Sequence, residues 1–192
     1  MILVWAKDKC NSVVRRYKAV MGKKIVISFP GGRGYEIPVL YFGAKYYEDQ
    51  GYEKVFIRHP RNEECEFDVL LDNADKIVSQ IDFSEYDDIV FVAKSIGTVV
   101  ACQIKDKYHI PATQILFTPL NETLPYIHRK NDIKLVAVGD KDRYIDVEMF
   151  RKVCDKEGVL CHIEEGVGHR MEVLSDLDKN LDVISNVIKK LY

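Results

Sequence analysis

The feature that most constrains the fold of this 192-residue chain is a series of apolar runs that alternates with helix-like segments. Each run is nearly continuous, as expected for parallel strands that are covered on both faces. The runs occupy 23–29, 52–60, 86–95, 112–119, 132–140 and 159–166. Helical candidates occupy 37–49, 72–81, 97–108, 121–130, 146–157 and 174–191. The repeated strand–helix units predict an α/β fold, a three-layer α/β/α sandwich around a mostly parallel open sheet.

The two ends of the chain add further expectations. Segments 2–6 and 12–17 are candidates for an antiparallel strand pair. In the last helical candidate, apolar residues recur at intervals of three and four, which predicts one stripe packed on the sheet. These residues are Leu174, Leu177, Leu181, Ile184, Ile188 and Leu191. We expect a single domain over 1–192, because the chain contains no repeat or linker-like segment.

The composition excludes several classes of protein. With 47% hydrophobic and 30% charged residues and a net charge of −2, nothing calls for nucleic acid or a membrane surface as a partner. The start has only six apolar residues before Lys7, too few for a signal-peptide core. Five cysteines without a CxxC spacing indicate reduced thiols in a cytoplasmic protein, with no metal or organic cofactor. Nothing in the sequence indicates an oligomeric state.

Ser95 stands where the run at 86–95 should turn into the helix at 97–108. The local sequence AKSIG (93–97) is a small-x-Ser-x-Gly pattern. At a strand-to-helix turn, this pattern lifts a nucleophilic hydroxyl above the sheet, and its small residues let strand and helix approach closely. The alternative is a helix-capping serine, since serine is favoured at that position.

An aspartate follows a later strand. Asp142 lies in the turn after the run at 132–140, where a carboxylate could hold a histidine in the tautomer that a general base needs. Asp140 and Asp146 are alternatives for this task, although Asp146 has the context of a helix cap. Acidic residues are also common in turns without any catalytic role.

The candidate base is His169, in the glycine-rich turn after the last predicted strand. His59 also ends a strand at the same edge of the sheet and is the alternative. His109 should lie at the opposite edge, His162 lies inside a strand, and His128 ends a helical segment. A serine, an aspartate and a histidine that follow three strands in this order match one chain order of the Ser-His-Asp triad.

The chain resembles a small, cap-less member of the α/β-hydrolase fold superfamily, on the motifs PGGRG, AKSIGT, GDKD and GVGH. The resemblance covers nearly the whole chain from residue 23. It implies that Ser95 is the nucleophile, His169 the general base and acid, and Asp142 the acid that orients it. It also implies an oxyanion hole made by the backbone N–H groups of Ile96 and Gly32.

The resemblance leads to a serine hydrolase that cleaves an ester or thioester through an acyl-enzyme, with a small-molecule acyl substrate. Arg33 is the alternative second oxyanion donor, and Arg33, His59 and Lys94 are candidates for lining the substrate site. Because 118–132 has room for one helix only, we expect no cap domain and an open site. Two other functions fit the same residues: a catalytically silent binding module, and an acyltransferase that uses an acceptor other than water.

Overall fold

The computed structural model of the protein describes residues 22–32, 37–58, 66–173 and 175–192. The predicted strand pair at 2–6 and 12–17 lies outside these residues, as do Arg33 and His59. The other candidate site residues lie inside them, namely Gly32, Lys94, Ser95, Ile96, Asp142 and His169.

Six strands form one sheet in the order β2-β1-β3-β4-β5-β6, and every neighbouring pair is parallel. They are β1 (Lys23–Phe29), β2 (Glu53–Phe56), β3 (Tyr86–Lys94), β4 (Thr113–Phe117), β5 (Ile133–Gly139) and β6 (Cys161–Glu164). The sequence steps from β1 outward to β2 and then returns to the other side of β1 with β3. This reversal is a topological switch point, beside which ligands of open α/β sheets bind.

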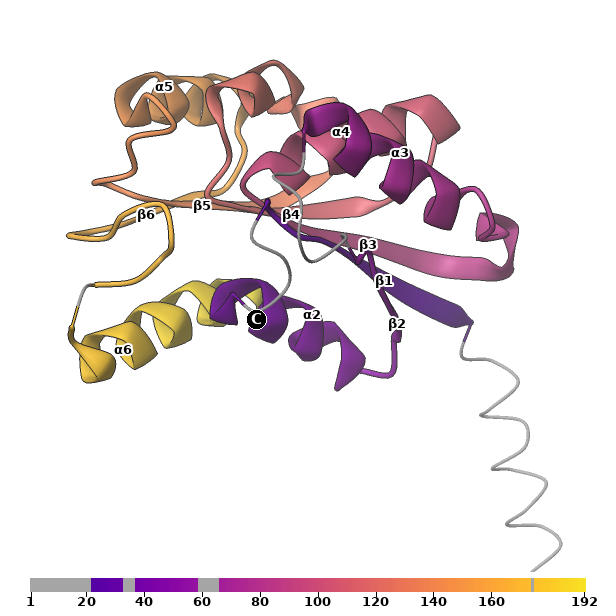
Figure 1. The fold of residues 1–192 in the computed structure, drawn as a ribbon, viewed down its shortest axis with the longest axis horizontal. Helices are drawn as coiled ribbons and strands as arrows, with labels where there is room; N and C mark the ends of the chain where they lie inside the picture. The colour runs from indigo at the N-terminus through magenta and orange to yellow at the C-terminus, as the bar shows by residue number, and fades with distance from the viewer. Residues whose placement is uncertain (1–21, 33–36, 59–65, 174) are drawn as a thin grey trace, which may run out of the picture.

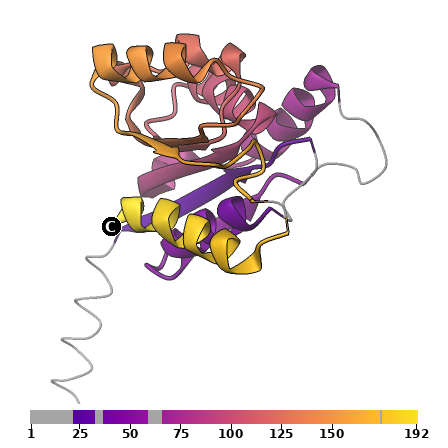
Figure 2. The same ribbon diagram turned by 90° about the vertical axis from the view of Figure 1, so that its left-hand side faces the viewer.

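Helices cover both faces of the sheet (Figures 1 and 2). They are α2 (Pro38–Glu48), α3 (Phe67–Val78), α4 (Ile96–Tyr108), α5 (Val147–Glu157) and α6 (Leu177–Ile188). Figure 1 shows α2 and α6 on one face and α3, α4 and α5 on the other. The predicted three-layer α/β/α sandwich is therefore confirmed. No helix of the described residues is both long and apolar enough to cross a lipid bilayer.

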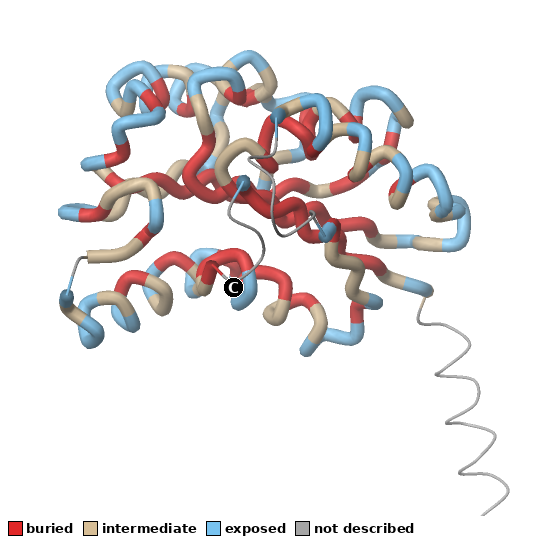
Figure 3. The backbone as a smooth tube through the Cα atoms, viewed as in Figure 1, coloured by how far each residue is buried: buried red, intermediate tan, exposed pale blue. Residues whose placement is uncertain are grey.

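The core consists of two apolar clusters, one on each face of the sheet. Figure 3 shows that the central strands between them are buried along most of their length. In β3, Phe91 belongs to the cluster beneath α3, α4 and α5, whereas Val90 and Val92 belong to the cluster beneath α2 and α6. All three are almost fully buried. Side chains of a strand alternate between faces, so two covered faces require apolar residues at successive positions. This is the physical origin of the unbroken apolar runs.

The helix predicted at 121–130 needs correction. Residues 121–130 do not form an α-helix but two short 3-10 helices, η2 (Asn121–Tyr126) and η3 (Arg129–Asn131). Pro125 lies inside η2 and lacks the N–H that an α-helix would use at this position. The segment between β4 and β5 contains no inserted domain, in agreement with the expectation of no cap.

The apolar stripe predicted for the last helix is confirmed for Ile184 and Ile188, which pack against the core, but is wrong for two other members. Leu174 lies outside the described residues. Leu177 and Leu181 are 72% and 60% exposed. The face of α6 that packs on the sheet carries Val183 and Val187 instead. These valines are followed at the same spacing by the buried Leu191. The helix is therefore rotated relative to the predicted stripe, because several apolar spacings coexist in its sequence and packing selects one.

The start of α4 lies unusually close to the end of β1. A Cβ atom at Gly97 would lie 2.5 Å from the Pro30 carbonyl oxygen and closer still to that of Phe29. Only glycine allows this approach, which brings the N-terminus of α4 beside the loop after β1.

We expect Gly97→Ala to lower the free energy of unfolding by about 2 kcal/mol, because the new methyl group would overlap rigid backbone atoms. Denaturant titration would measure the change. Gly32→Ala is the matched control, since a Cβ atom there meets nothing within 4 Å. Equal stabilities of the two variants would contradict the close approach.

Candidate active site

Ser95 is the single residue between the last residue of β3 and the first residue of α4. Its backbone has φ 56° and ψ −131°, a conformation that residues other than glycine rarely adopt. The surroundings hold this turn: Ser95 N–H donates to the Phe117 carbonyl at 3.0 Å, and a Cβ at Gly31 would lie 2.9 Å from the Ser95 Cβ. Ala93, which replaces the first glycine of the usual pattern, is fully buried in the strand.

The Ser95 side chain does not cap the helix. It occupies the N-cap position of α4 but makes no capping hydrogen bond. Asp146 and Asp176 show what capping looks like in this protein, because their carboxylates accept the N–H groups of Met149 and Lys179. The Ser95 Oγ instead lies 2.7 Å from His169 Nε2. The capping interpretation of this serine is therefore wrong.

His169 connects Ser95 to a buried carboxylate. Its Nδ1 lies 2.8 Å from Asp142 Oδ2, and the Asp142 side chain is fully buried. The other carboxylate oxygen, Oδ1, accepts the N–H of Tyr144 at 2.9 Å. Because a carboxylate only accepts, Nδ1 must carry the proton. In the neutral ring, Nε2 is then the acceptor for the Ser95 hydroxyl proton.

The alternative aspartates have other partners. Asp140 accepts the N–H of Gly166 at 2.7 Å and lies 3.2 Å from the Lys141 ammonium. Partial burial favours the neutral form of Asp140, but Lys141 and the Gly166 N–H outweigh it and keep the pKa of this carboxyl below its ordinary value. Asp146 caps α5, as its sequence context predicted. The structure thus brings Asp142, and neither alternative, to His169.

The other described histidines lie elsewhere. His109 follows the last residue of α4, at the opposite edge of the sheet from Ser95. The His162 ring lies 2.6 Å from the Glu164 carboxylate on β6. His128 precedes η3 and does not line the pocket at Ser95. Among the described residues, no group of three His, Cys, Asp or Glu side chains could hold a metal ion.

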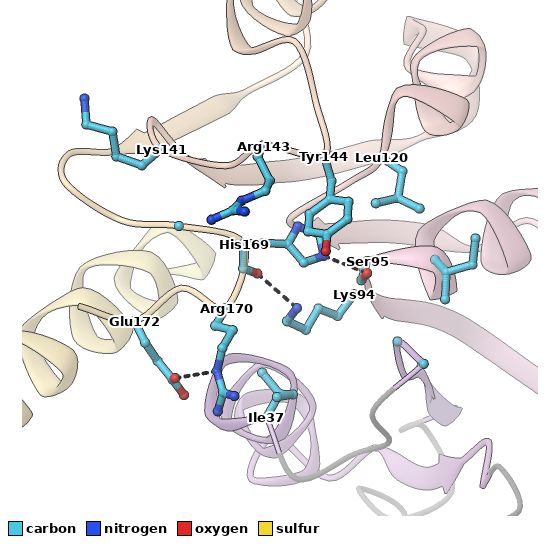
Figure 4. A pocket seen from close by; sticks show the side chains of 14 residues that line it. Ile37, Lys94, Ser95, Leu120, Lys141, Arg143, Tyr144, His169, Arg170 and Glu172 are labelled. Atoms are coloured by element: carbon cyan, nitrogen blue, oxygen red, sulfur yellow. Dashed lines mark hydrogen bonds and ion pairs between the residues drawn. The ribbon is translucent and has the colours of Figure 1, made fainter. Parts of the chain in front are cut away.

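A pocket of about 570 Å³ opens over Ser95 and His169 (Figure 4). Gly31 and Gly32 line it from the loop after β1, and Ile37 and Leu120 contribute apolar walls. Ile96 also lines it and is the first residue of α4, where an N–H group has no acceptor within the helix. Both predicted oxyanion donors, Ile96 and Gly32, therefore lie at the pocket that contains the serine hydroxyl.

Lys94 also lines this pocket, although the residue is only 4% exposed. Its ammonium donates to the His169 backbone carbonyl at 3.1 Å. Lys94 thereby links the strand that carries Ser95 to the turn that carries His169.

Sequence reasoning assigned no role to Arg143 and Tyr144, which also line the pocket. The Tyr144 ring lies over His169, with ring centroids 4.6 Å apart and planes tilted by 54°. Both residues directly follow Asp142 in the loop after β5. Their position next to the candidate acid, at the edge where the strands end, was the available signal.

Solved structures with the same architecture settle the fold. The chain superposes with a TM-score of 0.66 on an α/β serine hydrolase homologue from Coxiella burnetii, at 12% identity over 88% of this chain and 85% of that chain. The chain has the α/β-hydrolase fold. Est1E from Butyrivibrio proteoclasticus shares this α/β-hydrolase fold with a TM-score of 0.59, at 14% identity over 91% of each chain.

A protein of unknown function from Agrobacterium tumefaciens gives a TM-score of 0.65 at 15% identity over 88% of this chain and 84% of that chain. The sequence matches no protein-family model and no curated protein. At these identities the likeness concerns the α/β-hydrolase fold alone, so the roles of Ser95, His169 and Asp142 must be argued from their geometry.

We expect the Nδ1 proton of His169 to give a far-downfield proton NMR resonance, because it is bound to a buried carboxylate. Asp142→Asn should remove or strongly shift this resonance, and His169→Gln would assign it. Asp140→Asn is the matched control and should leave it in place. Loss of the resonance in Asp140→Asn, with retention in Asp142→Asn, would refute the pairing.

Proposed function

We propose that the protein is a serine hydrolase that cleaves an ester or thioester through an acyl-enzyme formed on Ser95. The observation that carries this proposal is the chain of short contacts from Ser95 Oγ to His169 Nε2, and from His169 Nδ1 to Asp142. It starts at a strained turn, where the hydroxyl bonds to the imidazole rather than to the helix.

In the first step, His169 Nε2 takes the proton of the Ser95 hydroxyl while the oxygen attacks the carbonyl carbon of the substrate. The buried Asp142 carboxylate stabilises the imidazolium that forms. The oxyanion of the tetrahedral intermediate accepts hydrogen bonds from the N–H groups of Ile96 and Gly32. His169 then gives its proton to the leaving alcohol or thiol, and the acyl group remains on Ser95.

In the second step, water attacks the acyl-enzyme. His169 removes a proton from the water, and the same two N–H groups bind the new oxyanion. Collapse of the intermediate returns the proton to Ser95 and releases the carboxylic acid. The open pocket beside Ser95 leaves room for this water molecule.

A fluorophosphonate probe should label the wild-type protein at Ser95, and Ser95→Ala should abolish labelling. Hydrolysis of short p-nitrophenyl esters should fall in Ser95→Ala by about a thousandfold or more, as expected when a nucleophile is lost. Mass spectrometry of the labelled peptide identifies the residue. Neither labelling nor hydrolysis in the wild type would favour a silent binding module, and ester products formed with added alcohols would favour an acyltransferase.

Lys94 acts in this proposal as a positioning residue. The turn that carries His169 is closed by the Met171 N–H, which donates to the Gly168 carbonyl at 3.0 Å. Met171 is fully buried and has φ 57°, so the turn is conformationally demanding. The Lys94 ammonium donates a hydrogen bond to the His169 carbonyl in the same turn. Because Ser95 directly follows Lys94, this bond fixes the position of the imidazole relative to the nucleophile.

Lys94→Met keeps most of the side-chain volume but removes this bond, so we expect fluorophosphonate labelling to slow by about tenfold. Lys105→Met is the matched control. Lys105 is also buried and donates to two carbonyls, of Ile110 and Ala112, but beyond the other end of α4. Lys105→Met should lower the denaturant midpoint of unfolding but leave the rate of fluorophosphonate labelling unchanged. Equal rates of fluorophosphonate labelling in Lys94→Met and in the wild type would overturn the positioning role.

A further inference from the structure

The pocket at Ser95 has an uneven charge. Among the described residues that line it, four side chains are cationic and one is a carboxylate. The cations are Lys94, Lys141, Arg143 and Arg170, and the carboxylate is Glu172. Substrate bound here would therefore meet a positive field, apart from the buried Asp142 behind the imidazole.

Two of these cations already have carboxylate partners. Arg170 Nε lies 2.7 Å from Glu172, and Lys141 lies 3.2 Å from Asp140. Figure 4 shows the Arg170–Glu172 pair, and it shows the Lys141 side chain pointing away from Ser95 and His169. Neither cation is a strong candidate for binding an anionic substrate.

Arg143 differs from them. Within the described part of the chain, its guanidinium has no hydrogen bond or ion pair, and the residue is exposed. The neighbouring Asp142 cannot neutralise it, because that carboxylate is fully buried and its oxygens bind His169 and the Tyr144 N–H. Figure 4 shows the Arg143 side chain descending from the loop after β5 toward His169. An unengaged guanidinium thus lines the pocket that contains Ser95 and His169.

A guanidinium is always charged near neutral pH, and its planar fork matches the oxygens of a carboxylate or phosphate. Ile37 and Leu120 add apolar walls to the same pocket, which suit the apolar part of such a substrate. We propose that Arg143 is a specificity-determining residue that binds an anionic group of the substrate, so that the preferred substrates are esters or thioesters with a carboxylate or phosphate near the reacting carbonyl. This inference rests on the proposed hydrolase function.

The test compares two esters of equal chain length, mono-p-nitrophenyl glutarate and p-nitrophenyl pentanoate. We expect kcat/KM to favour the glutarate ester by about tenfold, as for one charge-assisted hydrogen-bonded contact. The preference should shrink as salt rises from 0.1 to 1 M, where the Debye length falls from about 10 to about 3 Å. A third ester carries a phosphonate in place of the glutarate carboxylate. Comparing its kcat/KM with that of the glutarate ester shows which of the two anions Arg143 prefers.

Arg143→Gln should remove most of this preference, so that the ratio of the two kcat/KM values falls by about tenfold. Arg151→Gln is the matched control, because Arg151 is an exposed arginine on α5 that does not line the pocket. Its ratio should stay at the wild-type value. A wild-type ratio near one, or an equal ratio in wild type and Arg143→Gln, would overturn the role of Arg143.

Failure of the hydrolase function and failure of the anionic specificity give different results. If the proposed function is wrong, neither ester is hydrolysed faster than its spontaneous rate without the protein, and Ser95 is not labelled. If only the anionic specificity is wrong, both esters are hydrolysed without a charge preference. As a second measurement, free glutarate should slow the fluorophosphonate labelling of the wild type more than that of Arg143→Gln; equal protection of the two proteins would count against the inference.

Discussion

Burial of a parallel sheet on both faces is the constraint on which the rest of this structure depends. The strands must be apolar at successive positions, and each connection must bring the chain back to the opposite edge of the sheet, in most cases through an α-helix. All strands then end at the same edge, where the chain leaves the core and polar side chains can reach solvent. Ser95, Asp142 and His169 lie at that edge because each comes after a different strand, β3, β5 and β6.

The sharp turn at Ser95 depends on this packing. A positive φ at a serine is unfavourable in isolation, and such strain persists only where the surroundings determine the conformation. Here β3 is central in the sheet and α4 begins at once, against the end of β1, where Gly31 and Gly97 leave room. The strained residue presents its hydroxyl to His169 instead of to the first turn of the helix. Core packing thus maintains the geometry on which the proposed chemistry relies.

Polar groups around the pocket differ in how firmly they are held. Asp142 is buried and uses both carboxylate oxygens, and Lys94 is buried and binds the His169 carbonyl. Such groups serve to orient, because moving them would leave a buried polar atom without a partner. Arg143 is exposed beside them and is bound to no described carboxylate. This contrast separates the residues proposed to hold the catalytic geometry from the residue proposed to recognise substrate.

Much of the fold and of the candidate site was readable from the sequence. Apolar runs predict the six strands, since burial on both faces leaves a local pattern, and strand ends indicate which loops meet. The helix at 121–130 was predicted wrongly despite Pro125, because its apolar residues also suit a packed loop.

By itself, the sequence determined the α/β architecture and the Ser–Asp–His order, because each strand, helix and turn motif is a local pattern and the order of these motifs can be read along the chain. Only the tertiary structure decided that Ser95 bonds to His169 rather than capping α4, and that Asp142 reaches His169 while Asp140 binds Gly166. It also decided that Val183 and Val187 face the sheet in place of Leu177 and Leu181. Side-chain direction at turns and helix rotation are set by contacts between distant segments, and these contacts exist only when the sheet is assembled.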